Sequence, residues 1–139
     1  MIIEKEYIPI LSDALESFTL QPEEYNIPYD IYTSTEFEEF HTGFSTNDAK
    51  ALIEQLSNGN HNISDSCINY IYNIVLSYKS LVNFVLLYET ESPETKAEII
   101  VTRKSINALI RFLKSSCSQN NIELYILDDE SEEDDFFFL

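Results

Sequence analysis

The sequence predicts a single domain of the α+β class, with about three helices packed on a small, mostly antiparallel sheet. Apolar residues recur with helical period near residues 46–57 and 103–116. Between and around these stretches lie short runs of Ile, Val, Leu and Tyr, bounded by proline or by polar residues, which is typical of strands. The alternative is an all-helical fold, because one of these runs also fits the continuation of a helix.

Two short strands are expected in the first third of the chain. Residues 2–11 place isoleucines on either side of Pro9, and proline is tolerated in an edge strand because it has no N–H to donate to the ladder. Residues 27–33, which follow Pro22 and include Pro28, predict the second strand.

A helix over residues 46–57 has both of its end signals. Ser45 and Asp48 have the spacing of a capping box, in which each side chain bonds the backbone N–H of the other residue. Asn58 and Gly59 supply the stop at the other end. Its buried stripe consists of Ala49, Leu52, Ile53 and Leu56.

A second helix is expected to begin near Ser64, and where it ends is open. A line of small polar residues marks one side of it: Asp65, Asn69, Asn73 and Ser77, which Ser80 and Asn83 can extend at helical spacing. One helix to about Tyr88 is therefore one alternative. The other, which we favour from the residue types, is a β-hairpin of strands near 82–90 and 96–102 around the turn-like residues 91–96.

The globular domain is expected to end at Leu127. A helix over about 103–116 is followed by the turn residues Asn120 and Asn121 and by a last strand over 122–127. Residues 128–139 form a separate acidic tail that ends in three phenylalanines and a leucine.

The formal charge of −17 is unevenly distributed. Residues 1–65 carry −11, residues 66–127 carry +1, and residues 128–139 carry −7. Such a field repels nucleic acid and anionic membranes, so we expect neither as a direct partner and instead expect a basic protein. Four basic side chains lie on the helix at 103–116, where solvation of that helix is their simplest role: Arg103, Lys104, Arg111 and Lys114.

No catalytic or metal-binding motif is present, so we predict a protein that is not an enzyme and that uses no metal or cofactor. His41 and His61 lack the HExxH spacing, and Cys67 and Cys117 lack CxxC spacing and are expected to be buried free thiols. With 2 glycines, the chain has few positions for a loop that cradles phosphate. The sequence shows no signal peptide, and the apolar run at 81–88 is short for a membrane span, so a cytoplasmic location is expected.

Three interpretations of the tail remain open. Its last residues could fold back on the domain, it could be a short recognition peptide, or its acids could mimic phosphate in a basic channel. In form, residues 128–139 resemble the acidic, phenylalanine-ended tails of single-stranded-DNA-binding proteins, which recruit partner proteins. The bacterial pattern has a proline before the final phenylalanine, and this chain does not.

The function predicted from these patterns is that of an acidic inhibitor or immunity-type protein. It would cover a basic surface of a nuclease or of another nucleic-acid-acting protein. Mimicry of nucleic acid is one way in which it could do so. The alternative is an adaptor of a larger assembly that recruits partners through its phenylalanine-rich C-terminal peptide. Acids supply electrostatic complementarity and aromatic residues supply binding energy. The predicted partner-binding residues are Glu23, Glu24, Tyr25, Tyr29, Asp30, Tyr32, Glu36, Phe37, Glu38, Glu39, Phe40, Asp134, Asp135, Phe136, Phe137, Phe138 and Leu139.

Overall fold

A computed structural model of the chain describes residues 1–20 and 44–125. Over these residues the protein is 77% helical, with four α-helices and no strand. The predicted α+β fold is therefore wrong, and the all-helical alternative describes this part of the chain.

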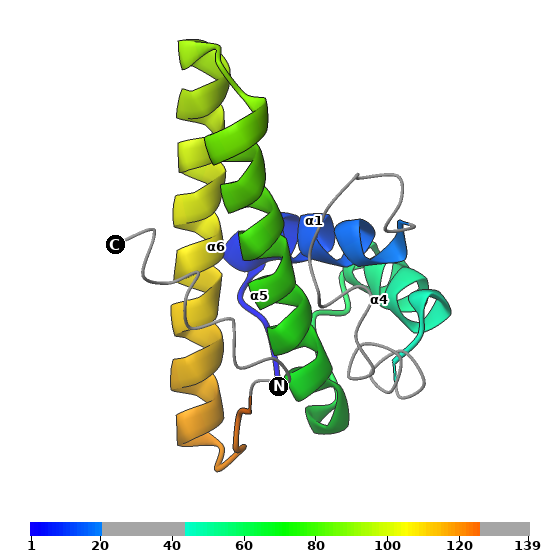
Figure 1. The fold of residues 1–139 in the computed structure, drawn as a ribbon. Coiled ribbons are helices and arrows are strands. Elements are labelled where there is room, and N and C mark those ends of the chain that lie inside the picture. Colours follow the sequence, from blue (N-terminus) through cyan, green and yellow to red (C-terminus); the bar gives the residue numbers. More distant parts are fainter. Residues whose placement is uncertain (21–43, 126–139) are drawn as a thin grey trace.

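The four helices form a long pair and a shorter pair (Figure 1). Helix α5 (Ile68–Phe84) and helix α6 (Pro93–Gln119) run side by side in opposite directions. Helix α1 (Ile8–Thr19) crosses them and packs against both, and helix α4 (Thr46–Ser57) packs on α1. Three short turns adjoin these helices: the 3-10 turns Lys5–Tyr7 before α1 and Asp65–Cys67 before α5, and the π-helical turn Val85–Glu89 after α5.

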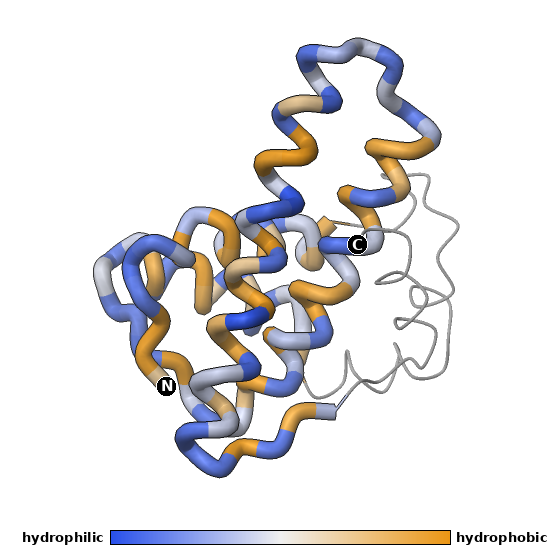
Figure 2. The backbone as a smooth tube through the Cα atoms, turned by 90° about the vertical axis from the view of Figure 1, so that its left-hand side faces the viewer, coloured by the Kyte–Doolittle hydropathy of each residue, from blue (hydrophilic) through white to orange (hydrophobic). Residues whose placement is uncertain are grey.

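One end of the α5–α6 pair extends beyond the rest of the described chain (Figure 2). The first six residues of α6, 93–98, are all exposed, and Val101 is 63% exposed. On the facing turn, Leu87 is 54% and Tyr88 is 73% exposed. This end, which we call the tip, therefore carries little of the core.

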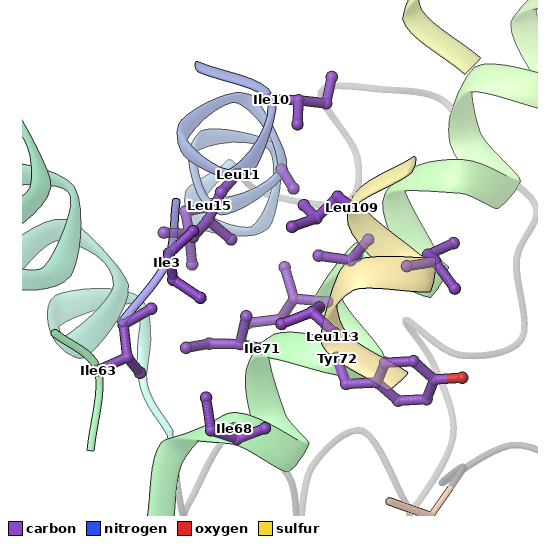
Figure 3. Close-up of a cluster of buried hydrophobic side chains, with 14 of the residues drawn as sticks. Ile3, Ile10, Leu11, Leu15, Ile63, Ile68, Ile71, Tyr72, Leu109 and Leu113 are labelled. Atoms are coloured by element: carbon purple, nitrogen blue, oxygen red, sulfur yellow. The ribbon is translucent and has the colours of Figure 1, made fainter. Parts of the chain in front are cut away.

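The core lies where α1 crosses the long pair (Figure 3). Each large apolar side chain buried there contributes about 1.5–3 kcal/mol to stability. The N-terminal segment, every helix and the 58–64 connection contribute to it, and its largest fully buried side chains include Ile3, Leu11, Leu15, Leu56, Ile63, Ile68, Ile71, Ile106, Leu109 and Leu113.

The strand predicted at residues 2–11 is wrong, because residues from Ile8 onward form α1. Pro9 lies in the first turn of that helix, where backbone N–H groups have no intrahelical acceptor to lose. What remains of the extended conformation is a single antiparallel bridge between Ile2 and Asn62. The strand predicted at 27–33 lies outside the described residues.

The hairpin predicted at 82–90 and 96–102 is also wrong, because both segments are helical. Ser92 and Pro93, which suggested a turn, are instead the N-cap and the first residue of α6, and the Ser92 hydroxyl accepts a hydrogen bond from the Thr95 N–H at 3.4 Å. β-Branched residues lower helix propensity only slightly, so the run at 99–102 is compatible with a helix. The alternative of one helical stretch to about Tyr88 is confirmed, since helical structure continues to Glu89.

Helix α4 is confirmed with the bounds that its end signals predict. The helix predicted at 103–116 is part of α6, which is longer at both ends. The last strand predicted at 122–127 is wrong as far as Tyr125, where the structure describes the chain, because residues 122–125 form no ladder.

Candidate partner-binding surface

All of the predicted partner-binding residues lie outside the described part of the chain, in the two segments 21–43 and 126–139. These are the eleven residues from Glu23 to Phe40 and the six from Asp134 to Leu139 that are named above. The structure does describe the points at which both segments join the helices. We call these points the two roots.

The root of segment 21–43 is a cluster of three aromatic rings. Phe18 is in the last turns of α1, and Phe44 is the first described residue after the segment. Their ring centroids are 6.1 Å apart with the planes nearly perpendicular, and Phe44 also packs against Tyr70 of α5 at 5.7 Å. Edge-to-face pairs of this kind add about 0.5–1.5 kcal/mol beyond the area that they bury. The segment therefore leaves the scaffold and returns to it at one place.

The return of the chain into α4 is fixed by the capping box. The Ser45 hydroxyl accepts a hydrogen bond from the Asp48 N–H at 3.2 Å, and the Asp48 carboxylate accepts one from the Ser45 N–H at 2.9 Å. Two N–H groups that a helix leaves without partners are thus satisfied.

The root of segment 126–139 is held by two asparagines of α5. The Asn69 amide donates to the Glu123 carbonyl at 2.9 Å and accepts from the Tyr125 N–H at 3.0 Å. The Asn73 amide donates to the Tyr125 carbonyl at 3.1 Å and to the Asn69 carbonyl at 2.8 Å. Side-chain amides thus bind this extended backbone as a neighbouring strand would.

The two roots attach to the same turn of α5. Tyr70, which contacts Phe44, lies between Asn69 and Asn73, which hold Tyr125. The described residues carry 12 acids and all 8 basic residues of the chain, a formal charge of −4, and the other 13 acids are in the two segments. A nearly neutral helical scaffold therefore carries two strongly acidic segments that start from adjacent points.

Among the described residues, no group of three or more His, Cys, Asp and Glu side chains could hold a metal ion. Burial raises the pKa of the Cys117 thiol, and the charge of Asp65 raises it further, which disfavours the nucleophilic thiolate. Cys117 is a buried free thiol, as expected, whereas Cys67 is free but only half-buried.

Two shallow hollows lie on the described surface. One, of 330 Å³, is lined by residues of α4 and of the chain before α5, and the other, of 370 Å³, lies between α1 and α6. Asp13 lines the second, and partial burial, followed by the charge of Glu16, raises its pKa. A second carboxyl group, that of Glu6, lines the same open hollow, and both acidic residues are exposed.

That the asparagines of the second root bind the backbone of residues 123 and 125 was not predicted from the sequence. Their line of polar residues was identified, but it was used only to judge the length of a helix. The residue type was the signal that could have identified this contact. The line carries amides at positions where a surface helix normally carries charged residues. Asparagine offers both a donor and an acceptor, as a backbone partner requires.

One helical stretch among the described residues, Asp65–Glu89, is long and apolar enough to cross a membrane by composition alone, with a mean hydropathy of 1.3. Half of its most apolar window is buried against the other helices, which core helices of soluble proteins also show.

Comparison with known proteins adds no relative. No family model, no curated protein and no solved structure matches the chain.

Proposed function

We propose that this protein is a non-catalytic acidic binding protein of the inhibitor or immunity type. It covers a basic surface of a nuclease or of another nucleic-acid-acting protein. The observation that carries the proposal is the separation of charge between a scaffold of −4 and two segments that hold 13 of the 25 acids.

The length of the first segment supports this proposal. Twenty-six residues separate Thr19 at the end of α1 from Thr46 at the start of α4, whereas packed helices are usually joined by about 2–8 residues. Helices α1 and α4 already pack against each other, so their packing does not require a connection of this length. Six acids and five aromatic residues lie within 21–43, which is the combination that a basic partner surface with apolar pockets would bind.

The mechanism is steric occlusion aided by electrostatic attraction. A partner that binds nucleic acid carries a positive field, which accelerates association with an acidic protein and disfavours neutral competitors. Aromatic side chains such as Tyr25, Tyr29 and Phe37 would then supply the contacts that slow dissociation.

The test is capture from extracts of the source cells, followed by an activity assay on the purified partner. The variant Glu36→Gln/Glu38→Gln/Glu39→Gln removes three charges from segment 21–43. The matched control Glu91→Gln/Glu94→Gln/Glu98→Gln removes three exposed charges from the tip, so both variants have the same net charge.

We expect the wild type and the control to inhibit the partner's action on nucleic acid, and the first variant to bind at least about tenfold more weakly. Binding should also weaken between about 0.1 M and about 1 M salt. Equal binding by both variants, or a partner that does not act on nucleic acid, would exclude the proposal. A partner lost on deletion of 136–139 and insensitive to salt would instead identify an adaptor.

A further inference from the structure

The open hollow between α1 and α6, which we call the α1–α6 hollow, has a lining that is partly apolar and partly acidic. Its volume is 370 Å³. Its apolar part includes Val101 of α6, which is 63% exposed. Its two acids, Glu6 and Asp13, come from the turn before α1 and from α1 itself, and both are exposed.

The acids of α6 lie on the side of that helix that lines the hollow, and its basic residues do not. At 3.6 residues per turn, Glu94 and Glu98 fall within the sector of about 120° that the lining residues of α6 define. The five basic residues of α6 all fall outside this sector: Lys96, Arg103, Lys104, Arg111 and Lys114. The charge beside the hollow is therefore negative on both helices.

The acids on the α1 side repel one another and have no basic partner. A side-chain hydrogen bond with Glu6, followed by burial and by the charge of Glu6, raises the pKa of Glu4. Burial, followed by the charge of Glu16, raises the pKa of Asp13. In the described part of the chain, no ion pair joins any of these four carboxyl groups to a lysine or an arginine. A cation brought to the hollow would therefore relieve repulsion between like charges.

The lining suits a cation with an apolar stem. Among the described residues, no group of three or more His, Cys, Asp and Glu side chains could hold a metal ion. A lysine or an arginine side chain can instead pair with one carboxylate while its stem packs on apolar surface. The Tyr7 ring also lines the hollow, where it stacks on Phe112 with the ring centroids 4.7 Å apart, and aromatic rings attract cations.

The acidic and apolar face extends beyond the hollow towards the tip. Glu94 and Glu98 are exposed, and from Glu94 to Ala108 this face of α6 spans fourteen residues, about 21 Å. A surface of this length fits a segment of polypeptide, which is longer than a single small cation.

We propose that the α1–α6 hollow binds a basic, amphipathic segment of a partner protein. An apolar side chain of the segment covers Val101, and its lysine or arginine side chains pair with Glu6, Asp13 and Glu98. This surface consists of helix and turn residues that the structure describes. The inference therefore does not depend on the proposed function, which rests on the two acidic segments.

A synthetic helical peptide of lysine and leucine, about 21 Å long, is the probe, and NMR of the isotope-labelled full chain locates its binding. At about 0.15 M salt, we expect the largest shift changes at the amides of Asp13, Val101 and Ser105. A peptide of the same charge with serine in place of leucine should bind at least about tenfold more weakly, because it has no apolar side chain to cover Val101.

Two double variants with the same net charge separate the hollow from the general acidity of the chain. Glu6→Gln/Asp13→Asn should bind the lysine–leucine peptide at least about fivefold more weakly than the wild type. Its matched control, Glu54→Gln/Glu123→Gln, changes two exposed acids elsewhere and should bind within about twofold of the wild type. Val101→Thr keeps the shape of the side chain but adds a hydroxyl, and it should weaken binding at least about threefold.

Four outcomes would overturn the proposal. Shift changes that avoid the α1–α6 hollow would place the binding elsewhere. Equal binding by the two double variants, with the helices shown folded by circular dichroism, would show that the acids of the hollow do not bind the probe. Equal binding by the lysine–serine peptide would show that charge alone attracts it. Binding of free spermidine as tight as that of the lysine–leucine peptide would assign the hollow to a small polyamine.

Discussion

The Tyr125 backbone N–H donates to the side-chain oxygen of Asn69 at 3.0 Å, although the two residues are 56 positions apart. This contact closes the described fold, because it ties the chain after α6 back to the start of α5.

Replacing Asn69 with alanine should release residues 122–125. Two hydrogen bonds to the backbone are lost, and each contributes about 0.5–1.5 kcal/mol, so the free energy of unfolding should fall by about 1–3 kcal/mol. Urea denaturation measures this loss, and amide exchange at Tyr125 should become faster. Asn47→Ala, on the exposed side of α4, is the control and should change neither quantity.

Removal of the cap of α4 should weaken the root of segment 21–43. Ser45→Ala loses the hydroxyl that accepts from the Asp48 N–H, whereas the backbone N–H of residue 45 can still donate to the Asp48 carboxylate. A loss of about 0.5–2 kcal/mol in unfolding free energy is expected, and thermal melting would detect it. Ser118→Ala, at an exposed position of α6, should melt with the wild type, and an equal loss there would mean that the cap contributes nothing.

Truncation of Leu109 should be among the most damaging changes to the core. Leu109 is fully buried on α6, so Leu109→Ala leaves a cavity as well as losing apolar burial, at a cost of about 2–5 kcal/mol. Val101→Ala on the same helix, 63% exposed, should cost less than about 0.5 kcal/mol. Chemical denaturation of both variants checks the difference, and similar midpoints would contradict this placement of the core.

The two cysteines should react with a thiol reagent at different rates. Cys117 is 1% exposed, and its pKa is raised by burial and by Asp65, so its thiolate is both rare and inaccessible at neutral pH. Cys67 is half-buried and should be labelled first. Mass spectrometry of the partly labelled native protein gives the order, and denaturant should make the two rates similar.

Ionised Asp13 should lower stability at neutral pH. Partial burial and the charge of Glu16 raise its pKa above the ordinary value of 3.8, so the folded protein binds this proton more tightly than the unfolded chain does. The contribution of Asp13 to stability is therefore fully present below the unfolded pKa of 3.8 and is lost as the pH rises through the higher folded-state pKa.

Asp13→Asn should remove this pH dependence. Because the side chain is exposed and screened by solvent, we expect a gain of only a few tenths of a kcal/mol in unfolding free energy at pH 7. Melting temperatures measured across this range for the wild type, for Asp13→Asn and for Glu54→Gln as control would check it. If Asp13→Asn were less stable than the wild type at pH 7, ionised Asp13 would stabilise the fold, and this prediction would be wrong.

Elements with local end signals could be predicted from the sequence. Helix α4 matched its predicted bounds because Ser45, Asp48 and Gly59 act through neighbours within a few residues. Helix α1 was missed because Pro9 was interpreted as an edge-strand residue, although proline is equally suited to the first turn of a helix. The β-branched residues at the start of α6 favoured strands, and the packing of their helix against α5 overrode that weak preference.

For the candidate surface, the sequence predicts which residue types it contains but not where its segments join the helices. Charge counts identify the acidic segments, but the point at which each joins the scaffold depends on contacts between residues far apart, such as Phe44 with Tyr70 and Asn73 with Tyr125. Neither contact has a local signature. The polar line on α5 was visible as spacing, and what it binds became apparent only from the folded chain.

The exposed tip of the long helix pair also has a consequence for proteolysis of the chain. The buried residues of α6 begin at Ile106, and its first six residues, 93–98, are all exposed. Within the described residues, a protease is therefore expected to cleave first near residues 89–98, because local opening there costs little free energy. The two fragments would each retain part of one shared core, so they should stay together after the backbone is broken. Two separately expressed halves divided at the tip would accordingly form a split version of the protein.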